Sequence, residues 1–220
     1  MKLILNDYIS MNVTNYKKIS ATNLSLYKPI KIKSDLYKLD LRYKNSILVI
    51  QTPKVHIFNP PKINNYNGKL TINFGYSDID ERKIFIGKIR LIESFIKSSI
   101  KFILKKYASD KFYSSKLRSS IYTNHKNSNK YMNLQLDKKT VSIYDLFKNK
   151  HNINYLSPNS TLLNIIYIDG IWIKENEYGI NWCLLQSKVF PSIEKLEKCI
   201  IEDEYEDEPH KHYYNNTKIQ

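Results

Sequence analysis

Hydrophobic and polar residues alternate with a period of two in residues 36–44, LYKLDLRYK. Hydrophobic side chains fall on one face and charged ones on the other, which is the pattern of a half-buried strand. The hydrophobic face consists of Tyr37, Leu39, Leu41 and Tyr43. Asn45-Ser46 can turn the chain, and the apolar run ILVIQ at 47–51 then suits a buried partner strand. A third alternating segment follows the turn signal Asn67-Gly68 and extends to Tyr76.

After Gly75 the hydrophobic period changes from two to that of a helix. Hydrophobic residues recur on one narrow stripe, made of Phe85, Ile89, Ile92, Ile96, Ile100 and Ile103. Ser77 followed by Asp80 resembles a capping box, and the basic end suits a helix C-terminus. We therefore predict a helix from about residue 78 to 107. Its opposite face is basic and carries Lys83, Arg90, Lys97, Lys101 and Lys105.

The second half of the chain again predicts strands. Residues 108–130 are a polar loop with a short strand around 117–122, and further strands follow near 131–136 and 140–144. The apolar, β-branched run TLLNIIYIDGIWI at 161–173 predicts a buried central strand. Residues 180–190 return as its hairpin partner after the loop KENEYG. Pro191 ends that strand and starts a short helix to about Ile200.

This order of elements predicts a mainly β fold with one long helix. Three strands, a helix and then more strands are the order of an OB-fold-like barrel, with the helix between the third and fourth core strands. We expect residues 1–35 to form an N-terminal extension, residues 36–200 the OB-fold-like nucleic-acid-binding domain, and residues 201–220 a flexible acidic C-terminal tail.

Charge is distributed unevenly along this basic chain. It has 35 Lys and Arg against 21 Asp and Glu, a net charge of +14. Six of the acidic residues lie in the run EDEYEDE: Glu202, Asp203, Glu204, Glu206, Asp207 and Glu208. A body this basic attracts polyanions, and nucleic acid is the first expectation. Solubility, together with an AT-rich coding bias, is the alternative account of the lysines.

The residue types needed for catalysis do not gather in any familiar pattern. The five histidines are scattered, and there is no HExxH, Cys/His metal spacing or phosphate-binding glycine loop. Asp78, Asp80 and Glu81 could form a nuclease-type carboxylate group, but in the first turn of a helix they simply complement its dipole. Cys183 is expected to be an inert core residue. We therefore predict a non-enzymatic protein without cofactor or metal.

No segment resembles a signal peptide, and no run of 18 apolar residues could span a bilayer. The two cysteines, Cys183 and Cys199, make no disulfide framework. We expect an intracellular protein without a membrane partner.

Aromatic and basic residues are interleaved, most densely between residues 107 and 131. Single-stranded nucleic acid requires a cationic groove for its phosphates and flat rings on which unpaired bases stack. The chain has 18 Tyr, 8 Phe and 2 Trp. The candidate nucleic-acid-binding residues are Tyr43, Lys44, Lys54, Tyr113, Lys116, Arg118, Tyr122, Lys126, Lys130 and Tyr131. Trp172 and Trp182 lie in the most apolar part of the chain and are assigned to the core.

The acidic tail can mimic a phosphate chain and compete for a basic groove, in a salt-dependent manner. Displaced by DNA, it would be available to basic partners. The alternative is that EDEYEDE only makes the terminus soluble.

Four segments carry a resemblance to a known family. They are LDLRYKNSILVIQTPK (39–54), the predicted helix after LTINFGYSDID (70–80), GIWIKENEYGINWCLLQSKV (170–189), and the acidic tail. In these the chain resembles the phage-type single-stranded-DNA-binding proteins, which have an OB-fold barrel and an acidic tail, and their counterparts in nucleocytoplasmic large DNA viruses. Tails of that family commonly finish on acidic residues with a terminal aromatic, whereas this chain continues through PHKHYYNNTKIQ.

The resemblance implies a non-catalytic protein of viral DNA replication and recombination. It would coat single-stranded DNA at a viral replication site in the host cytoplasm or nucleus, as a homodimer, and its tail would contact a polymerase, primase or helicase. Two other functions stay open. A basic virion structural or DNA-packaging protein would bind duplex and single strands alike, and a nuclease-like enzyme would depend on a metal and on Asp80. The sequence does not separate DNA from RNA as the ligand.

Overall fold

The structure is a computed structural model that describes residues 12–64, 67–75, 80–107, 112, 114–124 and 128–190. Tyr113, Lys126, the helix expected to end near Ile200 and the acidic tail lie outside the described residues.

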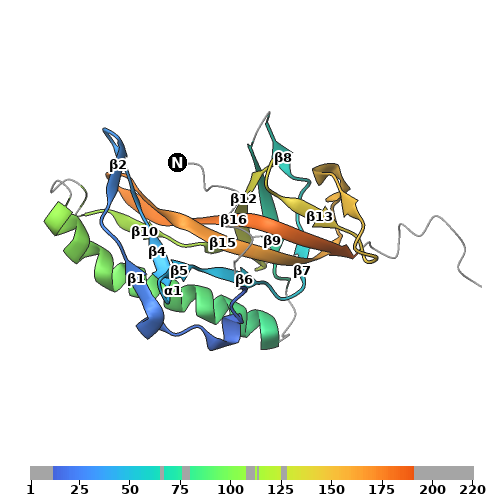
Figure 1. Ribbon diagram of the computed structural model, residues 1–220, viewed down its shortest axis with the longest axis horizontal. Helices are drawn as coiled ribbons and strands as arrows, with labels where there is room; N and C mark the ends of the chain where they lie inside the picture. Colours follow the sequence, from blue (N-terminus) through green and yellow to red (C-terminus); the bar gives the residue numbers. More distant parts are fainter. Residues whose placement is uncertain are drawn as a thin grey trace, which may run out of the picture.

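Within the described residues the fold is mainly β with one long helix, as predicted (Figure 1). The strands before the helix are β1 (Leu24–Leu26), β2 (Ile30–Lys33), β3 (Leu36–Leu39), β4 (Leu41–Tyr43), β5 (Ser46–Ile47), β6 (Val49–Gln51), β7 (Val55–Ile57), β8 (Lys62–Ile63) and β9 (Asn67–Asn73). The helix is α1 (Asp80–Tyr107). The strands after it are β10 (Lys116–Arg118), β11 (Ile121–Thr123), β12 (Lys130–Asp137), β13 (Ser142–Tyr144), β14 (Lys150–His151), β15 (Thr161–Ile173) and β16 (Glu177–Phe190). Short 3-10 turns occur at Tyr16–Lys18, Ala21–Asn23 and Ile153–Tyr155.

The antiparallel hairpin of β15 and β16 is the longest feature of the sheet. It pairs Thr161 with Phe190 at one end and Ile173 with Tyr178 at the other, which confirms the predicted hairpin. The predicted boundary of its second strand is wrong, because β16 begins at Glu177 and not at residue 180. Its register shifts twice, once between Ile165 and Ile166 and once between Ile168 and Gly170. At the second shift Asp169 is the extra residue, so it forms a β-bulge.

Five strands pair in a closed circuit that runs from β16 through β12, β9, β7 and β15 back to β16. The closing contact between β12 and β16 is parallel, at Gln135 and Cys183. Three separate segments follow the same edge of β15 in antiparallel register. They are β3 against residues 171–173, β6 against 165–167 and β7 against 161–162. The chain from β3 to β7 is therefore one interrupted strand of the circuit.

The predicted place of the helix is consequently wrong. Counted along the chain, α1 follows β9, which is the second strand of the circuit and not the third. Residues 36–44 and 47–51 had been interpreted as two core strands, but the chain between them leaves β15 and makes the small sheet β1-β4-β5. Its hairpin turns at Lys44 and Asn45, whose φ values of 50° and 64° are left-handed, one residue earlier than expected.

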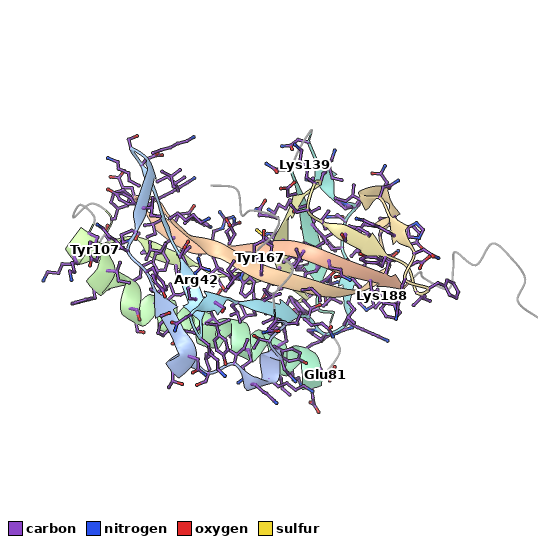
Figure 2. The ribbon with its side chains drawn as sticks, viewed as in Figure 1. Arg42, Glu81, Tyr107, Lys139, Tyr167 and Lys188 are labelled. Atoms are coloured by element: carbon purple, nitrogen blue, oxygen red, sulfur yellow. The ribbon has the colours of Figure 1, made fainter. Side chains whose placement is uncertain are left out.

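Helix α1 covers the core with the hydrophobic stripe that the sequence predicted. Phe85, Ile89, Ile92, Ile96 and Ile100 are buried, while the basic face is exposed. Burial of each such side chain stabilises the fold by about 1.5–3 kcal/mol. Glu81 and Tyr107 mark the two ends of the helix, which lie on opposite sides of the view in Figure 2.

The described part of the N-terminal extension belongs to the same core. Tyr16, Ile19 and Leu24 are buried in the main hydrophobic cluster. The ring of Tyr16 meets that of Phe85 edge-on, with centroids 5.3 Å apart. Residues 12–35 thus pack on α1 and on the sheet, and β2 extends the sheet beyond β3.

Candidate nucleic-acid interface

Two adjoining cavities open beside the β15–β16 hairpin and share three lining residues: Arg118, Trp172 and Asn181. The larger, about 650 Å³, reaches Lys69 on β9, Tyr122 on β11 and the polar side chains of β12. The smaller, about 480 Å³, reaches Ile32 on β2 and Lys38 on β3. Because they share walls, we treat them as one groove, the hairpin groove, which extends from β2 to β9 across β15 and β16. Figure 1 shows the positions of these four strands.

The indole of Trp172 lies at the middle of the hairpin groove. Trp172 pairs with Gly179 across the hairpin, and a Cβ atom on Gly179 would lie 2.7 Å from Cζ2 of the indole. The ring therefore covers the Cα of Gly179, a position that only glycine leaves open. The side chain is half-buried and lines both cavities. Such a fixed, partly exposed ring can stack on an unpaired base.

Tyr122 supplies a second ring at the far end of the groove. It is 40% exposed and stacks on Tyr131, with centroids 5.7 Å apart and an interplanar angle of 25°. Its hydroxyl donates to Oδ1 of Asn133 over 3.3 Å. Tyr131 itself is only 1% exposed and also packs against Phe58. Tyr131 thus supports Tyr122 from below and has no ring face for a base, so its predicted stacking role is wrong.

Tyr43 is also buried. Its hydroxyl donates to the carbonyl of Lys18 over 3.2 Å and accepts a hydrogen bond from Nδ2 of Asn23 over 3.3 Å. It anchors the small sheet β1-β4-β5 to the N-terminal segment, and neither it nor the exposed Lys44 lines the groove. The prediction that Tyr43 stacks on a base is wrong for the same reason as for Tyr131. Tyr43 is buried in the hydrophobic core, and Tyr131 is covered by the rings of Tyr122 and Phe58.

Four basic side chains line the groove among the described residues: Lys38, Lys69, Arg118 and Lys174. The ammonium of Lys174 lies 6.0 Å from the centre of a Trp172 ring. Two acidic side chains, Asp169 and Glu177, line the smaller cavity beside them. The predicted Lys116 and Lys130 stand on β10 and β12 but are not among the groove-lining residues. The groove therefore includes Arg118 and Tyr122 from the predicted set.

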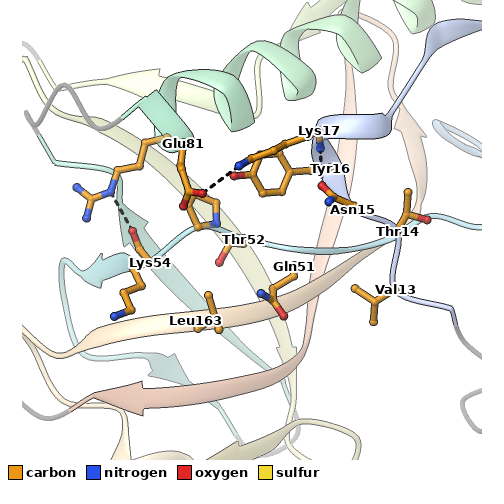
Figure 3. A pocket seen from close by; sticks show the side chains of 12 residues that line it. Val13, Thr14, Asn15, Tyr16, Lys17, Gln51, Thr52, Lys54, Glu81 and Leu163 are labelled. Carbon is orange, nitrogen blue, oxygen red and sulfur yellow. Dashed lines mark hydrogen bonds and ion pairs between the residues drawn. The ribbon is translucent and has the colours of Figure 1, made fainter.

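Lys54 lies in a different cavity, of about 680 Å³, between the N-terminal segment and the first turn of α1 (Figure 3). Lys17 and Glu81 form an ion pair on its wall, with Nζ and Oε1 3.0 Å apart. Nε of Arg82 donates to the carbonyl of Lys54 over 2.9 Å, and the Lys54 ammonium lies 4.6 Å from the ring centre of Phe190. This cavity shares no lining residue with the hairpin groove, so the structure separates Lys54 from Arg118 and Tyr122.

Comparison with known proteins finds one weak structural similarity. The chain matches no protein-family model and no curated protein. Among solved structures it is similar to gp2.5, a single-stranded DNA binding protein encoded by bacteriophage T7, with a TM-score of 0.48 and 8% sequence identity. The match covers 66% of this chain and 86% of that one. This TM-score does not establish a common fold, so the groove has to be judged by its own residues.

Sequence reasoning missed Trp172, which it had assigned to the core. In β15 the side chains that are at most 3% exposed are even-numbered from Leu162 to Ile168 and odd-numbered at Ile171 and Ile173, whereas Tyr167 is 8% exposed. The bulge at Asp169 causes this change of phase and turns Trp172 outward. Two signals in the sequence point to it: the isolated glycine after Asp169, inside a strand pattern, and the glycine at the hairpin position opposite the tryptophan.

The described residues offer no evident centre for covalent chemistry. Burial raises the pKa of the Cys183 thiol to about 12, so it stays protonated at neutral pH. No group of three or more His, Cys, Asp or Glu residues within the described ranges could hold a metal ion. In the same ranges, no helix combines the length and the apolar character that a membrane crossing requires. The groove is lined by rings, amides, four cations and two carboxylates, which suit non-covalent binding.

Proposed function

We propose that this protein binds single-stranded DNA, without catalysis, in the hairpin groove. The observation that carries the proposal is the half-exposed indole of Trp172, fixed over Gly179 between basic side chains. A base stacked on such a ring contributes roughly 1–3 kcal/mol, whatever its identity. Arg118 and Lys69 lie along the same groove, where they can contact the phosphates of the strand.

The circuit of strands supports an OB-fold-like barrel as the scaffold. OB folds bind oligonucleotides on the face of their second and third strands. In this chain β9 and β12 hold those places in the circuit. The groove is lined by Lys69 on β9 and by Asn133 and Gln135 on β12. The proposed site therefore lies on the face with which OB folds bind oligonucleotides.

The acidic block at residues 202–208 competes with DNA for the groove in this proposal. Its charge is opposite to that of the groove-lining lysines and Arg118. Deletion of residues 201–220 should then tighten binding of oligo-dT, and more so at low salt. Weaker binding after the deletion would contradict competition.

We further propose that the protein acts in viral DNA replication and recombination inside the host cell. In that role it coats single strands as a homodimer, and the tail contacts a polymerase, primase or helicase. These assignments rest on the resemblance of the sequence segments described above.

The exposed basic face of α1 favours a second candidate, a virion structural or DNA-packaging protein. Lys83, Arg90, Lys97 and Lys105 are all exposed there, on a convex surface that could follow phosphates of any nucleic acid. Such a protein would bind by charge alone and would not distinguish strands.

A competition experiment separates the two candidates. The full chain is offered oligo-dT, oligo-U and duplex DNA of equal length at two salt concentrations. Single-stranded DNA binding through the groove predicts tight, salt-sensitive binding of oligo-dT and little affinity for duplex. Equal affinity for duplex and oligo-dT would reject the proposed function in favour of packaging. The oligo-U arm decides whether the groove accepts RNA.

A further inference from the structure

The hairpin groove holds two carboxylates in the midst of its cations. One Asp169 carboxylate oxygen, Oδ2, lies 3.0 Å from Nζ of Lys38 and also accepts a hydrogen bond from Nδ2 of Asn181 over 3.1 Å. Oε1 of Glu177 lies 3.8 Å from an Arg118 guanidinium nitrogen. Two of the basic side chains that line the groove therefore already have an acidic partner inside it.

The backbone fixes where Asp169 stands. Asp169 is the extra residue of the β15 bulge, between the pairs Ile168–Trp182 and Gly170–Asn181. Gly170 has a φ of 146°, and a Cβ atom there would lie 2.8 Å from the carbonyl oxygen of Leu39. Only glycine allows β15 to approach β3 this closely, and this approach brings Asp169 within reach of Lys38.

The backbone also fixes Glu177, which begins β16. Its carbonyl accepts a hydrogen bond from the backbone N–H of Lys174 over 2.8 Å, which closes the hairpin. In the parallel register of β10 and β16, Lys116 pairs with Glu177 and Arg118 with Gly179. Arg118 and Glu177 therefore lie on adjacent strands, two residues apart.

These two ion pairs contribute little to stability. The side chains of Lys38 and Asp169 are 36% and 29% exposed, and those of Arg118 and Glu177 are 67% and 41% exposed. Ion pairs this open to water have small net effects on folding. Their consequence for the groove's ligand is larger, because a phosphate reaches Lys38 or Arg118 only by displacing a carboxylate.

When a phosphate displaces a carboxylate from Lys38 or Arg118, one ion pair replaces another, so the exchange contributes little to the free energy of binding. Duplex DNA offers a protein mainly phosphates, since its bases are paired and stacked inside the helix. An unpaired strand offers phosphates and also bases that stack on Trp172 and Tyr122. Each cation contributes more with duplex than with a single strand, since the slope of log affinity against log salt per phosphate contact is about 0.9 for duplex and about 0.7 for a single strand. The two carboxylates thus lower the affinity for duplex more than the affinity for a single strand, and they leave the stacking contribution, which only the single strand has.

We propose that Asp169 and Glu177 are specificity-determining residues that make the groove reject duplex and accept unpaired strands. This inference rests on the proposed function, because it assigns the selectivity of that same groove. If the two ion pairs had only a structural role, their removal would change the stability of the fold but not the ratio of the affinities for single-stranded and duplex DNA.

The test uses the full chain with Asp169→Asn, Glu177→Gln and both together. Affinities for oligo-dT and for a duplex of the same length are measured over a range of salt concentrations. In the double variant the slope of log affinity against log salt for duplex should steepen by about 0.9 for each of the two released cations. Duplex affinity should rise by about tenfold at low salt, and affinity for oligo-dT should rise less.

Glu175→Gln is the matched control. Glu175 is exposed in the same hairpin loop, but it is not among the residues that line the groove. Its neutralisation changes the net charge by one unit, as each single variant does, and should leave the ratio of oligo-dT to duplex affinity unchanged. Thermal unfolding is measured for every variant. If Asp169→Asn unfolds at a lower temperature, Glu177→Gln alone decides the test, because its pair is the more exposed.

The possible results separate the inference from the function on which it rests. A wild-type preference for oligo-dT that falls in the double variant, but not in Glu175→Gln, supports the inference. The same preference with unchanged duplex affinity and salt slope in the double variant overturns the inference and leaves the function standing. A wild-type protein that binds duplex as tightly as oligo-dT overturns both.

Discussion

The hairpin groove and the outer face of α1 are both basic and both carry an aromatic side chain, yet they differ in how those groups are held. On α1 the lysines and Arg90 project from a convex surface, and Phe102 is 73% exposed among them. In the groove Trp172 lies against Gly179 at a fixed position in the hairpin register. Charge is therefore no guide to which surface recognises bases.

The contrast teaches that a stacking site depends on the support of its ring. A ring that is already immobilised loses little conformational entropy when a base covers it, whereas a freely rotating side chain must be ordered first. Tyr122 follows the same rule, because Tyr131 supports it from the buried side. Phe102, in contrast, is 73% exposed and lies outside the groove.

The largest expected difference between the two regions comes from removing one aromatic ring from each. Trp172→Ala should weaken oligo-dT binding by about 5- to 150-fold, because it removes one stacking platform worth roughly 1–3 kcal/mol. Phe102→Ala is the matched change on α1 and should leave the affinity unaltered. Both are measured by fluorescence anisotropy of a labelled oligo-dT. Equal losses in the two variants would mean that exposure, and not support, determines stacking.

Removing charge gives a second, smaller contrast. Lys69→Ala should reduce the slope of log affinity against log salt by about 0.7, the contribution of one phosphate contact on a single strand. Lys97→Ala removes the same residue type from α1 and should leave the slope for oligo-dT unchanged. A reduced slope in the α1 variant would place the phosphate path along the helix.

Local sequence patterns predicted the elements and the β15–β16 hairpin, but not the pairing of the strands before the helix. The period of two in 36–44 and the helical stripe from Phe85 to Ile100 depend on neighbours in the chain, so both elements were found. In the structure β3, β6 and β7 all pair with the same edge of β15, because residues 40–48 between β3 and β6 leave that edge. This pairing joins residues far apart in the chain, so the local hydrophobic period does not indicate it. The helix was misplaced in the strand order for this reason alone.

The candidate site was predicted only in part, for a related reason. Arg118 and Tyr122 were found because their segment is polar and aromatic at once. Tyr131 was misjudged because the hydrophobic pattern of a strand shows which residues share a face of the sheet, but not whether other side chains cover that face. Here Tyr122 and Phe58 cover Tyr131. Trp172 was misjudged because it lies in the most apolar part of the chain, where the sequence marks no outward face, and the one-residue bulge at Asp169 turns its ring outward.

Two glycines allow a smaller test of ring support. Gly179→Ala places a Cβ atom against the indole and should lower oligo-dT affinity by several-fold, because Trp172 must move off β16. Gly87→Ala on α1 meets nothing within 4 Å and should raise the free energy of unfolding by about 0.5–1 kcal/mol, the usual gain in a helix. Binding isotherms and chemical denaturation of both variants check this. Unchanged binding in Gly179→Ala would show that the ring's position over Gly179 is unimportant.

The smallest expected effect concerns the strand beneath the groove. Cys183 pairs with Gln135 of β12 and Tyr167 of β15, and burial, aided by the nearby Asp169 carboxylate, holds the pKa of its thiol at about 12. In a Cys199→Ser background, iodoacetamide should therefore label the native protein very slowly at neutral pH and rapidly in denaturant, because the thiolate is the nucleophile. Labelling at the rate of a free thiol would mean that β16 opens in the native state. Trp172 would then lack a rigid support, and the distinction between the groove and the exposed side chains of α1 would fail.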